Sequence, residues 1–162
     1  EAREALDDDG NKKFYIGESG TVTSTNDAFS KQTAQIDATQ AIVDQITTNY
    51  VQVFESGMTG DLDGEDNEVL RSITNDAAAT LIKNIEFTPP LEIRWRIVQA
   101  SGKKKQYEYY VTKSYNVLDA ISAMKKAMLI EAAKVKIEDQ RKRFKAILQD
   151  KLIDDAVKKM TN

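Results

Sequence analysis

The longest regular pattern of apolar positions spans residues 28–54 and has the period of an α-helix. Phe29, Ile36, Val43 and Tyr50 recur seven residues apart, so they fall on one face of such a helix. Further apolar side chains fill in beside this face: Ile42, Ile46, Val53 and Phe54. A stripe of small residues follows on an adjoining face: Ala34, Ala38 and Ala41. Small side chains permit close packing, so we expect this helix to be covered on more than one side.

Before this helix the period changes to two, as in a half-buried β-strand. The alternation predicts one face made of Phe14, Ile16, Gly20 and Val22, and a second face made of Tyr15, Gly17, Thr21 and Thr23. Glycine weakens a strand, so Gly17 and Gly20 predict a bulge or a close approach of the backbone to a neighbour. The polar residues 24–27 then supply candidate caps for the helix.

The clearest local signal is a pair of alternating runs around a short turn at residues 101–105. The first run alternates apolar Leu91, Ile93, Trp95 and Ile97 with Glu92, Arg94, Arg96 and Val98. The second alternates Tyr107, Tyr109, Val111 and Tyr115 with Glu108, Tyr110, Thr112 and Ser114. Two such runs around a Gly-containing turn predict a β-hairpin. We expect its apolar and aromatic face to lie against the core.

Two further regions have helical patterns. Leu70, Ile73, Ala77 and Leu81 predict an amphipathic helix that ends near Asn84, and Pro89-Pro90 prevents its continuation. From residue 117 to about 160 there is no Gly or Pro, which favours one long helix. That helix either projects or bends within the polar stretch 137–143. Its later apolar seam, which includes Phe144, Leu148 and Val157, requires a partner in the chain or in another copy.

These elements predict an α+β fold: a small antiparallel sheet, made of one N-terminal strand and the hairpin, with helices packed mainly on one face and a long C-terminal helix. The expected organisation is an N-terminal tail over 1–13, an α+β core over 14–116, and the C-terminal helix over 117–162, packed on or extending from the core. The chain's 162 residues suffice for one such domain.

Composition removes several classes of function. The chain contains neither Cys nor His, so disulfides, thiolate metal sites and a Ser/His/Asp triad are excluded. Its net charge of −3 provides no general basic field for nucleic acid. The nearest approach to a nucleic-acid surface is a local group of basic and aromatic residues: Arg94, Arg96, Tyr110 and Lys103 to Lys105. No apolar run has the roughly 20 residues that a membrane span requires.

Residues 56–67 form a glycine-rich loop in which Asp61, Asp63 and Glu65 resemble the start of a calcium loop. Counted from Asp61, however, the sixth position is Asp66, where an EF-hand has Gly, and the twelfth is Ser72, where it has Glu. The alternative to a solvated connector is a small-ligand or calcium-binding module that uses the acidic loop 61–68. The sequence singles out no catalytic or cofactor-binding residue and no established metal ligand.

The Gly17-x-x-Gly20 motif, the polar cap and residues Ala28, Ala34, Ala38 and Ala41 resemble the Lpp-twenty lipoprotein family of bacterial envelopes, which is related to the N-terminal domain of the flagellar T-ring protein. The likeness covers roughly residues 14–115 and includes the aromatic strand around 109–111. It implies an exported, envelope-associated protein, often lipid-anchored, with no known catalysis. This chain differs by lacking an anchoring Cys and by its C-terminal helical region.

The expected function is therefore a non-catalytic structural or interaction module of the bacterial envelope, located in the periplasm or at the outer membrane. We expect no cofactor and no nucleic-acid partner. A protein partner, or self-association through the C-terminal helix, is expected instead. Membrane contact is expected only through a lipid anchor upstream of Glu1.

Overall fold

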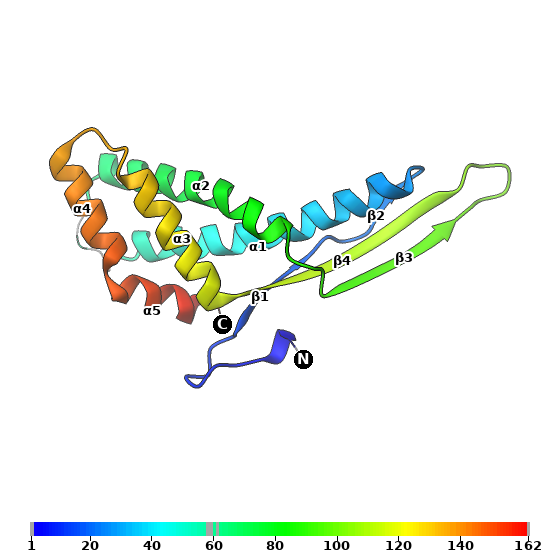
Figure 1. Cartoon of the computed structure of the whole chain (residues 1–162), viewed down its shortest axis with the longest axis horizontal. Helices are drawn as coiled ribbons and strands as arrows, with labels where there is room; N and C mark the ends of the chain where they lie inside the picture. The colour runs from blue at the N-terminus through cyan, green and yellow to red at the C-terminus, as the bar shows by residue number, and fades with distance from the viewer. Residues whose placement is uncertain (1, 58–59, 61, 162) are drawn as a thin grey trace.

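The computed structural model describes residues 2–57, 60 and 62–161 and has the predicted α+β class. After a short 3₁₀ turn, η1 (Ala2–Glu4), come β1 (Phe14–Glu18), β2 (Val22–Ser24), α1 (Asp27–Glu55) and α2 (Gly64–Glu86). The hairpin strands β3 (Glu92–Val98) and β4 (Gln106–Asn116) follow, and then α3 (Val117–Ala132), α4 (Glu138–Gln149) and α5 (Lys151–Met160). Figure 1 shows α2 to α5 gathered at one end, while the hairpin tip extends past the N-terminal end of α1 at the other.

The long strand β4 is the centre of the antiparallel sheet. Its C-terminal half pairs with β1, from Glu18 opposite Thr112 to Phe14 opposite Asn116. Its N-terminal half pairs on the same side with β2, where Val22 lies opposite Tyr109. On its other side β4 pairs with β3, from Glu92 opposite Thr112 to Val98 opposite Gln106.

A bulge separates β1 from β2. Three residues, 19–21, lie between the two strands, whereas only Tyr110 and Val111 lie between their partners on β4. The one extra residue reverses the alternation. Tyr15 and Gly17 therefore share the α1 side of the sheet with Val22, while Phe14 and Ile16 face the other side. The predicted bulge is confirmed, but the prediction that Phe14, Ile16 and Val22 share one face is wrong.

α1 begins at the cap Asn26, whose side chain accepts a hydrogen bond of 3.0 Å from the backbone N–H of Phe29. Its first half packs Ser30, Ala34 and Ala38 on the sheet, each with no exposed surface. Its second half packs larger side chains in the helical core: Ile42, Val43, Ile46, Tyr50, Val53 and Phe54. The heptad prediction is therefore wrong for Phe29 and Ile36, which are 58% and 48% exposed, because small residues occupy the face on the sheet.

The region predicted as one long C-terminal helix contains three helices. The first break lies at residues 133–137, just before the predicted bend, and the second lies at Asp150, which caps α5. α4 folds back along the bundle, so the later seam is buried inside the chain: Phe144, Leu148, Ile153 and Val157 are at most 3% exposed. An isolated helix of this length would leave that seam in water, and burial favours the folded-back arrangement.

Residues 2–13, predicted as a tail, lie against the side of the sheet opposite α1 (Figure 1). Leu6 forms a β-bridge with Lys12. Lys158 Nζ on α5 lies 2.8 Å from an oxygen of Asp7 and 3.3 Å from one of Asp9. Arg3 forms an ion pair with Glu18 on β1. These contacts join the N-terminal segment to both β1 and the C-terminal helix.

Candidate functional site

The hairpin is built to project. Its connecting loop turns at Gly102, whose φ of 71° is left-handed and therefore suits glycine. The Gln99 side chain donates a hydrogen bond of 3.1 Å to the Lys103 carbonyl across this loop, and the Lys103 N–H donates one of 3.0 Å to the Ala100 carbonyl. The loop and the adjoining ends of the strands stand clear of the helical bundle (Figure 1).

On the α1 side of the hairpin, an apolar row lies next to the covered part of the sheet. Ile93, Trp95 and Ile97 lie opposite Val111, Tyr109 and Tyr107. α1 covers Val111 and Tyr109, which are 0% and 7% exposed. It does not cover β3, where Ile93, Trp95 and Ile97 are 37%, 61% and 49% exposed, nor Leu91 just before the strand, which is 50% exposed. The expectation that this face lies against the core is therefore correct for β4 and wrong for β3.

Trp95 is held in place by its neighbour on β4. Its ring stacks on Tyr109 with 6.4 Å between ring centroids and 20° between ring planes. Tyr109 is in turn fixed by donating its hydroxyl hydrogen to a carboxylate oxygen of Asp27, at the start of α1. That hydrogen bond and, to a smaller extent, burial raise the pKa of the Tyr109 hydroxyl. The exposed indole therefore rests on an ordered platform, which lowers the entropy cost of binding a partner.

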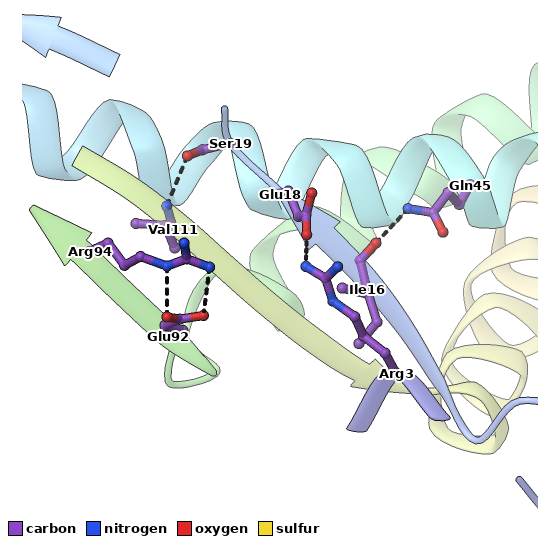
Figure 2. Close-up of polar contacts among 8 residues, drawn as sticks. All are labelled: Arg3, Ile16, Glu18, Ser19, Gln45, Glu92, Arg94 and Val111. Atoms are coloured by element: carbon purple, nitrogen blue, oxygen red, sulfur yellow. Dashed lines mark hydrogen bonds and ion pairs between the residues drawn. The ribbon is translucent and has the colours of Figure 1, made fainter. Parts of the chain in front are cut away.

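The opposite face of the hairpin carries paired charges. Arg94 Nε lies 2.7 Å from an oxygen of Glu92 (Figure 2), and the guanidinium lies 5.1 Å from the centroid of the Tyr110 ring. Arg96 Nε lies 2.5 Å from an oxygen of Glu108. Both guanidinium groups remain more than half exposed, and each has five N–H donors. Each arginine therefore has donors left for a further acceptor.

Antiparallel pairing also identifies the free backbone groups of β3. Val111 accepts a hydrogen bond of 2.9 Å from the Ser19 N–H, and its own N–H donates one of 2.9 Å to the Ser19 hydroxyl (Figure 2). The peptide groups of Val111 thus point toward β1 and β2. Because successive residues alternate, those of Tyr110 and Thr112 point toward β3 and pair with Arg94 and Glu92. The peptide groups of Ile93, Trp95 and Ile97 then point away from β4, where no described strand pairs with them.

The other edge of the sheet is capped at β1. Gln45 on α1 donates a hydrogen bond of 2.8 Å to the outward-facing carbonyl of Ile16, and Arg3 binds Glu18 beside it (Figure 2). A cavity of about 410 Å³ remains next to these residues, lined also by Lys12, Phe14 and Thr161. Side-chain caps of this kind block the addition of a strand. β3 is therefore the open edge, and we call its free peptide groups together with Leu91, Ile93, Trp95 and Ile97 the β3 surface.

In the acidic loop 61–68, Asp63 and Asp66 have structural partners within the protein. Asp61 lies outside the described residues. Asp63 caps α2 by accepting a hydrogen bond of 2.7 Å from the Asp66 N–H. Asp66 binds Gln140 at 2.9 Å and Arg143 at 2.8 Å; the Gln140 hydrogen bond and the adjacent guanidinium lower the pKa of Asp66. Asp63 thus caps α2 and Asp66 joins α2 to α4, and the described residues contain no cluster of three potential metal ligands.

The β3 surface could not be identified from the alternation alone, because the same pattern describes a strand whose apolar face is buried. The useful signal is the position of the strand: β3 precedes β4 directly and pairs with it as an edge, beyond the width that a single helix covers. Comparisons with known proteins give no further guidance. No protein-family model, no curated protein and no solved structure matches this chain.

Proposed function

We propose that this protein is a non-catalytic interaction module of the bacterial cell envelope that binds a protein partner at the β3 surface. The observation that carries the proposal is the succession of three apolar side chains, 37% to 61% exposed, along one open edge strand, with the half-exposed Leu91 just before it. Isolated exposed apolar residues are common on proteins and need no explanation. A continuous row beside unpaired peptide groups and a rim of arginines is typical of a binding surface.

A partner would bury the apolar side chains of this edge and pair its outward peptide groups. Fully burying an Ile or Leu side chain stabilises by about 1.5–3 kcal/mol relative to leaving it exposed. The outward peptide groups of Ile93, Trp95 and Ile97 would exchange water for regular strand hydrogen bonds. A protein contact through the C-terminal helices is the other expectation. It would have to use side chains such as Leu152, 60% exposed, since the main seam is buried inside the chain.

The non-catalytic part of the proposal is supported by the structural roles of three polar groups whose pKa is shifted: Asp66, Asp7 and Lys113. Asp66 joins α2 to α4, and Asp7 joins the N-terminal segment to α5. Lys113 is buried and donates to the carbonyls of Ile85 and Glu86 at the end of α2, where a cation offsets the helix dipole. Each of these groups has a structural partner that accounts for its position.

The envelope location rests on the resemblance of the strand and α1 to the Lpp-twenty lipoproteins, and it remains part of the proposal. Within the described residues, no helix is long and apolar enough to cross a membrane. Fractionation of cells that express the native gene tests this location. Recovery with periplasmic or outer-membrane markers is the expected result, and recovery with a cytoplasmic marker would contradict it.

The interaction itself is tested by photo-crosslinking in the native host. A photoreactive amino acid at position 97, on the β3 surface, is expected to give a discrete protein adduct that disappears when Trp95→Glu is added. The matched control places the same amino acid at position 118 on α3, where Leu118 is also 61% exposed. Equal adduct patterns at the two positions, or adducts that are indifferent to Trp95→Glu, would contradict the proposal.

A further inference from the structure

We infer that the β3 surface binds an extended acidic peptide segment, in which acidic and apolar residues alternate, as an additional strand of the sheet. This inference rests on the proposed interaction function and specifies the chemistry of the partner. The segment's apolar residues would continue the row of Ile93, Trp95 and Ile97 on the α1 side. Its acidic residues would lie next to Arg94 and Arg96 on the opposite side.

Backbone geometry supports a strand as the ligand. The outward peptide groups of Ile93, Trp95 and Ile97 provide three successive pairs of N–H and C=O groups at strand spacing. Strand addition uses such an edge for affinity and the alternating side chains for specificity. Gln45 caps the Ile16 carbonyl on the β1 edge, and β1 and β2 are only five and three residues long, so within the described chain the seven-residue β3 is the longest edge open to a full strand.

Charge supports an acidic ligand. Residues 92–108 contain five basic and two acidic side chains, a net charge of +3, whereas the whole chain carries −3. Oppositely charged side chains directly across two strands stabilise their pairing, and like charges destabilise it. An incoming acidic residue beside Arg94 or Arg96 meets an arginine side chain that is 66% or 74% exposed and already holds one glutamate. The lysines at 103–105 add a positive field near the hairpin tip that attracts such a segment.

Charge disfavours two of the registers in which a second copy of the chain could pair at this edge. In a symmetric antiparallel pairing centred on Trp95, Arg94 would face Arg96 of the second copy at two places. If the pairing is centred on Arg94, that residue faces itself. Both arrangements place like charges directly across the new strand pair.

A lipid surface satisfies the edge less well than a strand does. Trp95 and the basic tip are features of membrane-interface proteins. However, unpaired peptide groups inserted into hydrocarbon each cost several kcal/mol, and three of them border the apolar row. A peptide strand buries the same side chains and also pairs these groups.

The single tryptophan of the chain, Trp95, reports binding directly. The probe is a capped peptide of alternating valine and glutamate, long enough to pair with Ile93 to Ile97 and so to meet Arg94 and Arg96 but not Glu92, titrated into the full chain. We expect a saturable blue shift of the Trp95 emission. A peptide with lysine in place of glutamate should bind about tenfold more weakly, since two cross-strand pairs change sign. A peptide with N-methyl groups along one edge should still bind when its unmethylated edge faces β3. A peptide with N-methyl groups along both edges should give no emission shift.

Reversing the charges of Arg94 and Arg96 on the protein gives the test that matches the exchange of glutamate for lysine in the peptide. Arg94→Glu/Arg96→Glu should reverse the preference so that the lysine peptide binds more tightly. If that variant fails to fold, Arg94→Gln/Arg96→Gln should remove the preference while keeping polar side chains at both positions. Leu118→Glu, which changes an equally exposed site on α3, should leave both affinities unchanged.

Three results of the peptide and vesicle titrations would each overturn the inference: equal affinity for the two peptides, binding that survives methylation of both edges, or an emission shift with anionic phospholipid vesicles and none with the glutamate peptide. Dimerisation that prevents peptide binding, detected by light scattering, would assign the edge to a second copy of the chain and would also overturn the inference. If the peptide fails while the crosslinks from position 97 persist, the partner chemistry is wrong and the proposed function stands. If both fail, the proposed function falls as well.

Discussion

At the scale of single residues, Gly17 sets how closely α1 approaches the sheet. A β-carbon at this position would overlap the Ala38 carbonyl oxygen and lie 2.7 Å from Cγ1 of Ile42. The absence of a side chain here and the alanines on α1 therefore form one packing unit. Packing between β1 and α1 is therefore sufficient to explain Gly17 and the alanines of α1, whether or not the chain is related to the lipoprotein family.

The first prediction concerns this contact. Gly17→Ala should lower the free energy of unfolding by about 1–3 kcal/mol, because the added methyl group forces α1 away from the sheet. Urea denaturation measures the change. Gly64→Ala is the matched control, since a β-carbon there meets no atom within 4 Å. A Gly17→Ala protein as stable as the wild type would show that α1 does not lie this close.

Asp7 provides a prediction about pH. Its hydrogen bond to Lys158, assisted by backbone N–H donors of Asn11 and Asp9, lowers the pKa of Asp7 from 3.8 to about 2. A carboxyl group with a lowered folded-state pKa stabilises the fold above its unfolded-state pKa, and this contribution disappears as the pH falls through the folded-state pKa. The stability difference between the wild type and Asp7→Asn should therefore shrink as the pH falls from about 4 to about 2.

Urea titrations of both proteins across this pH range test the prediction. Asp8→Asn is the control, because Asp8 is the neighbouring carboxylate in the chain and is exposed. A difference between wild type and Asp7→Asn that stays constant over the range would show that the Asp7–Lys158 pair does not form in solution.

The sequence predicts the environment of some side chains but not of others. The close approach at Gly17 was predictable, because glycine inside a strand has few other uses. The exposure of Phe29 and Ile36 was not, since their heptad spacing matches that of buried Val43 and Tyr50. Lys113 is similarly misleading: it is buried among apolar residues only because the end of α2 provides carbonyl acceptors, and that juxtaposition is tertiary.

At the scale of elements, the C-terminal region shows what local pattern leaves open. Helix-forming residues without Gly or Pro predict helix throughout 117–160, and most of that region is helical. The breaks at 133–137 and Asp150 occur where no residue forbids helix. They are imposed by packing, because folding back buries Phe144 and Val157 against the rest of the core. Periodicity therefore predicts the helices but not their number.

This packing leads to the third prediction. Phe144→Ala should lower the free energy of unfolding by about 3–5 kcal/mol, the cost of a cavity in a core. Phe87→Ala removes the same atoms from a side chain that is 85% exposed and should change stability by less than about 0.5 kcal/mol. Thermal or chemical denaturation compares the two. Similar small effects would mean that α4 does not pack on the bundle.

At the scale of the whole molecule, the sheet is asymmetric: one edge is capped by side chains, whereas the other is open, apolar and bordered by basic residues. The hairpin and its apolar face follow from the alternation of residues 91–115. Whether that face is covered does not, because the answer depends on where α1 crosses the sheet and on the bulge that orients β1 and β2. The candidate site thus emerges only once the three-dimensional arrangement is known.

Hydrogen exchange of the β3 amides, measured residue by residue on the free protein, tests whether β3 is an open strand edge. We expect alternation: slow exchange for Arg94 and Arg96, whose N–H groups bond to β4, and fast exchange for Ile93, Trp95 and Ile97, whose N–H groups point outward. Slow exchange at all five positions would mean that the edge is already occupied. Slow exchange at the three apolar positions alone would mean that β3 pairs in the opposite sense, and either result would contradict an open strand edge.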